Sequence, residues 1–391
     1  MHTADFIIPP VAWEKRHAAF ALPEGVLHLD GASTSARLSG VQAAAHAAVD
    51  QGAAPWRVSH EALMQQLEST RQLAADLLFG GDVDGVAVVP SAAYGLATAA
   101  RNVPLASREA VLVLDGQFPS NLMAWQQRCT EVGAQVIAAT PALGQSPTDA
   151  VLEQLQRTPR IAVVALSHCD WHDGQLLDLD RIAPAVHALG AALVLDLSQS
   201  AGVLPIEPAQ WQPDFVVSVG YKWLLGPMGL AWLWASPRWR NEGTPIESHW
   251  IARDAGADWT FPVEAPPPFM AGARRFDAGA INDPIRLAMS ASGLAQLQHW
   301  GLARVAAALG EVTTALDDAL DTHGLPDWKT PDHAPHITGL RVPEVRREAV
   351  AAAFAAQDII CTPRKECLRL APSLTVKPEQ MARVVEIAAG A

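Results

Sequence analysis

Short apolar runs alternate with longer helical patterns through the first two-thirds of the chain, and this alternation constrains the fold more than any other feature. In the helical patterns, such as 61–78 and 180–189, apolar residues recur at steps of three and four. Nearly continuous apolar strands separated by helices are typical of a mostly parallel sheet that is buried on both faces. The sequence therefore predicts an α/β fold, with strands at Val26–Leu29, Val86–Val89, Ala110–Leu114, Gln135–Ala139, Ile161–Leu166, Ala192–Leu195, Phe215–Val219 and Leu230–Trp234.

The pattern loosens after Trp239 into a passage rich in proline and glycine. The run Pro266–Pro268 cannot lie inside a helix or a central strand, so we interpret this passage as a crossover between two domains that also lines the site. A helix is expected from Pro284 to about Gly310, followed by a smaller α+β unit. The expected organisation is an N-terminal arm (1–25), a large domain (26–245), crossover loops near the site (246–283) and a C-terminal small domain (284–391).

The composition favours a globular enzyme. Half of the 391 residues are hydrophobic and 18% are charged, so the chain can bury a large core. A net charge of −13 argues against a nucleic acid or an anionic membrane as partner. No apolar run approaches the roughly 18 residues of a membrane-spanning helix, and the first residues lack the basic-then-apolar order of a signal peptide. We therefore expect a cytoplasmic location, with no nucleic acid and no membrane as partner.

The spacing of the four cysteines offers no metal site. Cys129, Cys169, Cys361 and Cys367 include no CxxC pair, and their number is far below the density of a disulfide scaffold. We therefore expect no bound metal. Cys361 and Cys367 are either reactive thiols or residues of the packing or the surface, and the sequence leaves both interpretations open.

An aspartate and a lysine follow two of the buried runs. Asp196 closes the run ALVLD, and Lys222 comes just past the run FVVSV. Ligands of such sheets lie outside the carboxyl ends of the strands. A partly buried lysine has a lowered pKa and can form a Schiff base, and a nearby carboxylate can hold a pyridinium nitrogen protonated. Separately, Asp196 could cap a helix and Lys222 could extend to the surface, but together they favour pyridoxal phosphate (PLP) chemistry.

The segment from D-L-S-Q-S-A-G at 196–202 to G-Y-K-W-L-L-G-P-M-G at 220–229 resembles the core of the class V aminotransferase family. The likeness extends from HLDGAST at 28–34 to LRLAP at 368–372 and so covers most of the chain. It implies the fold of fold-type I PLP-dependent enzymes, with a large domain built on a mostly parallel seven-stranded sheet and a smaller C-terminal α+β domain. It also implies PLP as cofactor, a small amino acid as substrate and a homodimer.

The resemblance assigns roles to residues of this core. Lys222 matches the catalytic lysine that forms the Schiff base, and Asp196 matches the carboxylate at the pyridine nitrogen. Gln199 matches the side chain near the phenolic oxygen of PLP, and Ser198 is expected among the cofactor-binding residues. Tyr221 stands where desulfurases carry His and kynureninases carry Tyr, which is a phosphate ligand in both.

The segment VVPSAAYGLATAARN follows a strand and opens a helix. The N–H groups of Ala92 and Ala93 at a helix start suit a phosphate, and Ser91 can add a hydroxyl. A turn of small residues packed for space would look the same, but the family places its phosphate site here. The segment departs from the family's usual Gly-Thr-Thr pattern.

Phe118 follows another strand end, in VLVLDGQFPSN. An aromatic residue there could belong to the core, but in the family this position holds the ring that stacks on PLP. The local FPSN resembles the FPSD or FPTD of kynureninases, whose Asp also serves the pyridine nitrogen. Asn121 replaces that Asp, which weakens the kynureninase interpretation.

Near the C-terminus, Arg369 in CLRLAPS matches the arginine that binds the substrate α-carboxylate. A guanidinium can form two parallel hydrogen bonds with a carboxylate, which fixes the orientation of Cα. A surface ion pair is the ordinary alternative for Arg369. Arg364 lies close in the sequence and is a rival candidate for the same task.

Two further loops carry candidate contacts whose roles the sequence leaves open. His168, Trp171 and His172 follow a strand end in SHCDWHDG, where desulfurases carry an Asn. The segment RRFDAGAIND stands where the family often places a Gly-Thr that reaches the phosphate of the partner subunit. Ala280 takes the Thr position, and Asn282 is a possible substitute.

The reaction itself is less constrained than the cofactor. A transaminase needs only Lys222, the partners of the ring and a carboxylate clamp, so we expect a class V aminotransferase. A cysteine desulfurase or related C–S lyase, an epimerase and a kynureninase-like lyase or hydrolase of the same fold remain alternatives. Persulfide chemistry fits less well, because neither Cys361 nor Cys367 reads as a thiol on a mobile loop. A remote alternative is a PLP-fold protein that binds a partner without catalysis.

Overall fold

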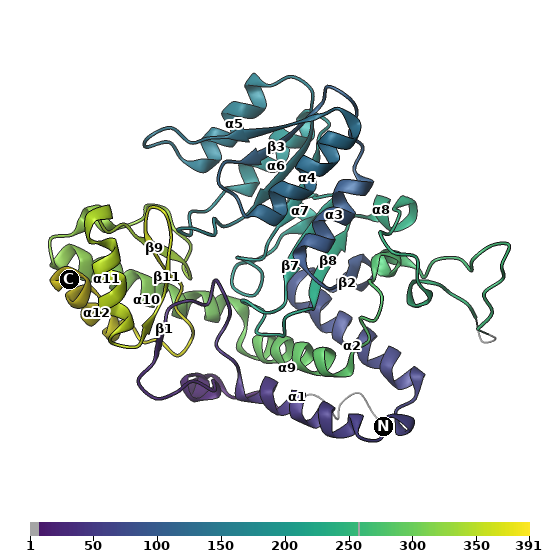
Figure 1. Cartoon of the computed structure of the whole chain (residues 1–391), viewed down its shortest axis with the longest axis horizontal. Helices are drawn as coiled ribbons and strands as arrows, with labels where there is room; N and C mark the ends of the chain where they lie inside the picture. The colour runs from purple at the N-terminus through teal and green to yellow at the C-terminus, as the bar shows by residue number, and fades with distance from the viewer. Residues whose placement is uncertain (1–7, 257–258) are drawn as a thin grey trace.

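A seven-stranded sheet forms the centre of the larger part of the molecule (Figure 1). The computed structural model describes residues 8–256 and 259–391. The strand order is β2-β8-β7-β6-β5-β3-β4. The strands are β2 (Val86–Val89), β3 (Ala110–Leu114), β4 (Gln135–Ala139), β5 (Ile161–Ser167), β6 (Ala192–Asp196), β7 (Phe215–Val219) and β8 (Ala231–Ala235).

Within this sheet only β8 runs against its neighbours. The pairs β3–β4, β3–β5, β5–β6 and β6–β7 are parallel, whereas β8 is antiparallel to both β7 and β2. The predicted α/β fold with a mostly parallel seven-stranded sheet is confirmed. Because β6 and β7 are adjacent and parallel, their carboxyl ends lie at the same edge, which brings Asp196 and the segment after Val219 together.

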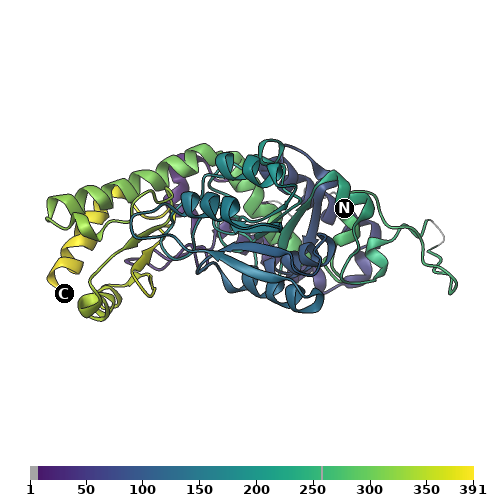
Figure 2. The same ribbon diagram turned by 90° about the horizontal axis from the view of Figure 1, so that it is seen from above.

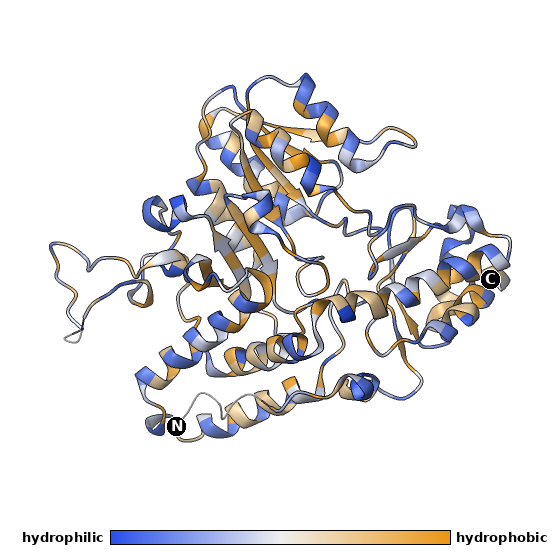
Figure 3. Ribbon diagram, turned by 180° about the vertical axis from the view of Figure 1, so that it is seen from behind, coloured by the Kyte–Doolittle hydropathy of each residue, from blue (hydrophilic) through white to orange (hydrophobic). Residues whose placement is uncertain are grey.

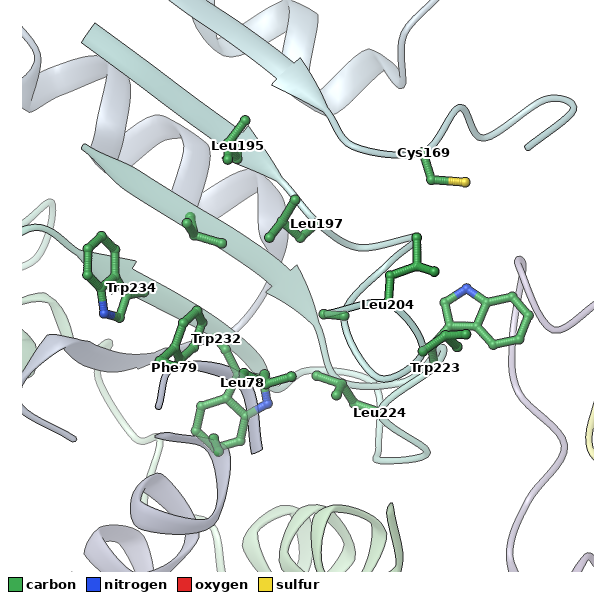
Figure 4. Close-up of a cluster of buried hydrophobic side chains, with 14 of the residues drawn as sticks. Leu78, Phe79, Cys169, Leu195, Leu197, Leu204, Trp223, Leu224, Trp232 and Trp234 are labelled. Carbon is green, nitrogen blue, oxygen red and sulfur yellow. The ribbon is translucent and has the colours of Figure 1, made fainter. Parts of the chain in front are cut away.

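Two apolar cores lie on the two faces of this sheet, since successive residues of a strand point to opposite sides. Leu193 and Leu195 of β6 belong to one core, and Val194 belongs to the other. Figure 3 shows the hydrophobic strands between amphipathic helices, and Figure 4 shows part of the first core. The helices of this part are α1 (Ser39–Gly52), α2 (His60–Leu78), α3 (Ala92–Asn102), α4 (Pro119–Val132), α5 (Pro147–Arg157), α6 (Leu179–Ala188), α7 (Pro208–Trp211), α8 (Pro237–Glu242) and α9 (Pro284–Trp300).

A smaller unit near the C-terminus has its own sheet and core, as expected (Figure 1). Three antiparallel strands in the order β11-β12-β9 accompany helices α10, α11 and α12. Strand β1 pairs in parallel with β10, which brings Leu29 into the core of this unit. The elements are β1 (Leu27–His28), α10 (Leu302–Thr322), β9 (Thr338–Leu340), α11 (Glu344–Ala355), β10 (Ile359–Ile360), β11 (Thr362–Pro363), β12 (Leu368–Leu370) and α12 (Met381–Gly390).

The helix expected from Pro284 to about Gly310 is two helices. Gly301 ends α9 with a φ of 79°, and α10 begins at the next residue. A positive φ is accessible to glycine at little cost, so Gly301 ends one helix and redirects the chain. Helix α9 packs against α1 and α2, while α10 leads to the smaller unit, as Figure 2 shows from above. The domain boundaries proposed from the sequence remain a prediction.

The passage between α8 and α9 reaches away from the rest of the molecule (Figures 1 and 2). Its described residues form two short 3-10 turns, Trp250–Ala252 and Gly272–Phe276, and an isolated bridge between Arg253 and Phe269. The prolines of the sequence are consistent with this irregular course. Of the helices in the described part of the chain, none has both the length and the apolar content needed to span a membrane.

Candidate active site

Lys222 lies just past β7, in a tight connection to β8. The N–H of Gly226 donates to the carbonyl of Gly220 at 2.8 Å, and the N–H of Gly220 donates to Leu230 at 3.0 Å. A Cβ on Gly220 would lie 2.8 Å from the Leu230 carbonyl oxygen, so only glycine fits there. The loop therefore holds Lys222 firmly, and its side chain is buried at 7% exposure.

Burial of the Lys222 amine lowers its pKa from 10.5 to about 8. Desolvation is the largest cause, because removing an ammonium from water disfavours the charged form. The charges of Arg369 and Arg364 lower the pKa further, whereas Asp196 and Asp30 raise it. The amine is thus neutral at a far lower pH than an exposed lysine, which is what a nucleophile or a base requires.

Asp196 is the last residue of β6 and is buried at 6% exposure. Its Oδ1 accepts a hydrogen bond from the N–H of Ser198 at 3.0 Å. The Ser198 hydroxyl in turn accepts from the N–H of Val219, at the end of β7, at 3.3 Å. These contacts join the ends of the two strands and fix the carboxylate beside the loop that carries Lys222.

Gln199 connects its own loop to two other segments through the nitrogen and the oxygen of its side-chain amide. Its Nε2 donates to the carbonyl of Ala32 at 3.0 Å, and its Oε1 accepts from the indole of Trp223 at 3.0 Å. Nε2 of the buried His336 also forms a hydrogen bond with the backbone carbonyl of Gln199. An amide has two donor hydrogens, so one remains for the predicted contact with the cofactor, which stays a prediction.

The start of α3 presents free donors. Ser91 is its N-cap, and the Ser91 hydroxyl accepts from the N–H of Tyr94 at 3.1 Å. Within the described residues, the N–H groups of Ala92 and Ala93 have no hydrogen-bond partner. Two unpaired N–H groups at the positive end of an 11-residue helix suit a phosphate, and the phosphate contact itself stays a prediction.

Several buried polar atoms near the same sheet edge also lack partners among the described residues. Both amide atoms of Gln117 are unpaired, as are Nδ2 of Asn121 and the hydroxyl of Ser167. Ser167 stands in register with Asp196, while Gln117 and Asn121 lie between β3 and the first turn of α4. An unpaired buried polar group costs about 1–3 kcal/mol, so these atoms indicate that a polar molecule completes the site.

Phe118 is the N-cap residue of α4, and its side chain is 41% exposed. Its ring centroid is 5.5 Å from Nζ of Lys222 and 5.3 Å from the Trp171 ring, which meets it edge to face. The indole of Trp171 is held by a hydrogen bond of 2.9 Å to the carbonyl of Gly116. An aromatic face therefore lies beside the amine, and the stacking of Phe118 on the cofactor ring stays a prediction.

Arg369 lies in β12 and is 1% exposed. Its Nη1 donates to the carbonyl of Trp171 at 2.7 Å, and its Nη2 donates to Oδ1 of Asp30 at 3.0 Å and to the hydroxyl of Ser33 at 2.5 Å. Arg364, the rival candidate, places its guanidinium carbon 4.6 Å from the Trp171 ring centroid. Both arginines therefore face the same tryptophan.

The other candidates occupy varied positions. Tyr221 is half-buried, and burial followed by the charge of Asp196 raises the pKa of its hydroxyl. His172 contacts Asp170, with Nδ1 and Oδ1 3.2 Å apart, and its ring lies against that of Trp171 at an interplanar angle of 42°. The His168 ring packs against Trp211 at 5.3 Å, and burial lowers its pKa to about 4. Their roles toward cofactor and substrate stay predictions.

The role predicted for the loop before α9 also stays a prediction. Ala280 has a φ of 58°, a left-handed conformation that is uncommon outside glycine, and Asn282 directly precedes the N-cap Asp283. Both residues lie at the end of the long passage between α8 and α9.

None of the cysteine thiols is activated. Burial raises the pKa of Cys361 and of Cys367 to about 12, and it raises the pKa of Cys129 and Cys169 as well. A thiolate is the reactive form of cysteine, so each thiol is a poor nucleophile at neutral pH.

Asp30 and Ser33 are site residues that the sequence reasoning did not single out. Both lie within the HLDGAST segment, and Asp30 follows an apolar run just as Asp196 does. That shared pattern, a carboxylate after a short strand, is the signal that could have found Asp30. Its partner Arg369 is 339 positions away in the sequence, so the pairing itself had no local signal.

Comparisons with known proteins identify the family and the fold of this chain. The family profile described as Aminotransferase class-V matches residues 27–384. An uncharacterized aminotransferase, YcbU, of Bacillus subtilis is 27% identical over 80% of this chain and 80% of its own length. The kynureninase of Deinococcus radiodurans is 30% identical over 68% of this chain and 64% of its own. A solved structure of a C-DES mutant, with glycine covalently linked to its PLP cofactor, has a TM-score of 0.83 and 18% identity, covering 95% of this chain and 98% of that one.

Proposed function

This chain belongs to the class-V aminotransferase family, whose cofactor is pyridoxal phosphate, and we propose that it removes the amino group of an amino acid and passes it to a keto acid. The observation that carries the proposal is the buried Lys222 amine, whose pKa is affected by the charges of Asp196, Arg369 and Arg364. A transaminase requires a lysine that moves protons, a partner for the ring nitrogen and a clamp for the substrate carboxylate. Lys222, Asp196 and Arg369 are the residues that we propose for these three tasks.

The residues around Lys222 fit the cofactor. The free N–H groups of Ala92 and Ala93 would hold the phosphate, with Ser91 beside them. Asp196 would hold the ring nitrogen, and Phe118 would cover the ring. When bound, pyridoxal phosphate withdraws electrons from the substrate Cα, so that a proton there becomes acidic. The unpaired polar atoms near Asp196 support the presence of such a group.

Lys222 would transfer the proton, and Arg369 would bind the substrate carboxylate. A neutral amine on Lys222 can accept the proton of the substrate Cα and return it elsewhere, and its lowered pKa of about 8 makes the neutral form far more abundant near physiological pH than in an exposed lysine. Arg369 would bind the α-carboxylate through its Nε, which is buried and unpaired among the described residues. This grip would fix the orientation of the Cα–H bond toward Lys222.

The thiols favour amino transfer over persulfide chemistry. A cysteine desulfurase needs a nucleophilic thiolate, whereas burial raises the pKa of both Cys361 and Cys367 to about 12. The replacement of the kynureninase aspartate by Asn121 weakens that alternative too. A lyase that needs no enzyme thiol and an epimerase remain as outcomes of the test.

We also propose that the chain forms a homodimer. The passage between α8 and α9 exposes large apolar side chains, among them Trp259 at 53% and Val263 at 99%. A cluster of exposed apolar groups on a projecting segment is typical of a surface that another chain covers. Sedimentation of the purified protein, with and without substitution of Trp259, tests this point.

The test of the function has two parts. First, the purified protein reconstituted with pyridoxal phosphate should show a visible absorption band that the Lys222→Ala variant lacks. Second, a panel of L-amino acids with a labelled amino nitrogen should pass the label to an acceptor keto acid. Release of sulfide, alanine or racemised substrate without label transfer would overturn amino transfer in favour of a lyase or an epimerase. A protein that binds no cofactor would instead be a non-catalytic member of the fold.

A further inference from the structure

The two arginines beside Trp171 differ in what they already bind. Arg369 is buried, and it makes three hydrogen bonds to Trp171, Asp30 and Ser33. One of these is an ion pair with Asp30 at 3.0 Å. The positive charge of Arg369 is therefore largely balanced within the protein before any substrate binds.

Among the described residues, Arg364 has no such carboxylate partner. It stands on the turn between β11 and β12, which is closed by a hydrogen bond of 2.8 Å from the N–H of Arg364 to the carbonyl of Cys367. Its guanidinium lies over the Trp171 ring, and its Nε is buried without an acceptor among the described residues. A guanidinium has five donors that match a carboxylate geometrically, so this one is free to bind an anion.

The position of Arg364 places it within the active site. The guanidinium of Arg364 lies over the Trp171 ring, and the Phe118 ring contacts the same ring edge to face. The backbone carbonyl of Trp171 accepts a hydrogen bond from Arg369. Phe118 in turn lies beside the Lys222 amine. The same aromatic pair thus links the reacting end of the site to Arg364.

In the part of the chain that the structure describes, the acidic groups near Arg364 form no ion pair with its guanidinium. Asp30 contacts Arg369, and its field reaches Arg364 without a direct bond. Asp170 contacts His172, and Asp173 forms an ion pair with Arg341 at 3.1 Å. Asp196 is buried at the strand end beside Ser198.

We propose that Arg364 binds a second anionic group of the substrate, a carboxylate or a sulfinate or sulfonate on the side chain, so that the enzyme acts on acidic amino acids. This inference rests on the proposed function, in which Arg369 holds the α-carboxylate near Lys222. The distal anion would lie against Trp171, where the aromatic ring restricts the guanidinium and excludes water on one side. Arg364 is then a specificity-determining residue.

Calorimetric binding of unreactive anions to the holoenzyme tests the proposal. Succinate and 3-sulfopropionate carry two anionic groups, and propionate carries one. We expect both doubly charged ligands to bind roughly 10-fold or more tightly than propionate, since a hydrogen bond to a charged group is worth that factor or more. Arg364→Gln should remove this preference while leaving propionate binding nearly unchanged. Arg364→Lys, which keeps the charge, should retain part of it.

Lys365→Gln is the matched control, because it removes one positive charge from an exposed neighbour on the same turn. Its preference should equal that of the wild type. The proposal is overturned if the wild type does not prefer the doubly charged ligands, if Arg364→Gln keeps the preference, or if it weakens propionate as much as succinate. The last result would make Arg364 the α-carboxylate clamp.

Failure of the proposed function would look different. Binding of these anions requires no reaction, so Lys222→Ala should keep the preference even though it abolishes turnover. A protein with the preference but without amino transfer would retain the Arg364 site and lose only the proposed reaction.

Discussion

The carboxylate of Asp30 accepts a hydrogen bond from the guanidinium of Arg369 at 3.0 Å, and this pair joins the N-terminal segment to the C-terminal sheet. The hydroxyl of Thr362, in β11, also donates to Oδ1 of Asp30, at 2.6 Å. Asp30 therefore sets the position of the guanidinium that would bind the substrate.

Asp30→Asn should raise KM more than it lowers kcat, because the amide keeps an acceptor but no longer balances the buried charge of Arg369. We expect a loss of about 1–3 kcal/mol in the free energy of unfolding as well. Steady-state kinetics and urea unfolding measure the two effects. Asp50→Asn, at an exposed position on α1, is the control and should change neither. An unchanged KM in Asp30→Asn would show that the pair does not position Arg369 for substrate.

Arg71 and Asp277 form a buried ion pair whose loss should be costly. Arg71 is 0% exposed, and its two Nη atoms meet the two carboxylate oxygens of Asp277 at 3.0 and 2.7 Å. Arg71→Met would leave Asp277 buried without its partner, so the free energy of unfolding should fall by about 3–5 kcal/mol. Urea unfolding measures this loss.

Two further variants test the cause of that loss. Arg71→Met combined with Asp277→Asn should recover part of the stability, since the uncompensated charge is gone. Arg157→Gln removes an exposed arginine of a surface pair and should cost less than about 1 kcal/mol. A double variant no more stable than the single one would contradict the electrostatic explanation.

The lowered pKa of Lys222 predicts how the apoenzyme captures its cofactor. Only the neutral amine reacts with an aldehyde, and burial reduces the pKa from 10.5 to about 8. The rate of capture should therefore rise with pH and level off above about pH 8. Stopped-flow absorbance after mixing apoenzyme with pyridoxal phosphate measures it. A rate that kept rising toward pH 10.5 would indicate an amine with an ordinary pKa.

The start of α3 permits a test of the phosphate site that spares the helix. Ala92 is the first helical residue, where proline is tolerated, and Ser91 before it has the extended conformation that proline favours. Ala92→Pro removes one N–H donor, so pyridoxal phosphate should bind roughly 10–100-fold more weakly, as expected for a lost hydrogen bond to a charged group. Fluorescence titration of the apoenzyme measures the affinity.

Ser39→Pro is the matched control for this variant. Ser39 is the first residue of α1, is exposed and also follows an extended residue. It should leave both cofactor affinity and thermal stability unchanged. Equal affinities in Ala92→Pro and the wild type would exclude this N–H as a phosphate ligand.

Much of the fold could be predicted because its strands are continuous apolar runs with clear ends. The bounds of β2, β3, β4 and β7 agree with the prediction residue for residue. The break between α9 and α10 was missed because a single glycine in a periodic helical pattern usually carries no penalty large enough to end a helix. In this chain Gly301 adopts a positive φ, which only the surrounding packing determines.

The site was partly predictable for a related reason. Asp196 and Lys222 follow adjacent strands, so sheet topology alone brings them together. The pair of Asp30 and Arg369 depends on a contact between segments at opposite ends of the chain, which no local pattern encodes. The sequence leaves the role of His168 open; its ring packs against Trp211, a contact that no local pattern encodes.

Gly301 has a consequence for the distance between Lys222 and Arg369. On one side, Gly293 of α9 packs directly against the backbone of Leu224 and Leu225, just after Lys222. On the other side, α10 enters the unit whose sheet carries Arg369. One glycine therefore separates the helix that packs beside the Lys222 loop from the helix that leads to the unit carrying Arg369. A small change in the torsion angles of Gly301 would change the angle between α9 and α10. The gap between Lys222 and Arg369, which the proposed substrate must span, would then widen or narrow.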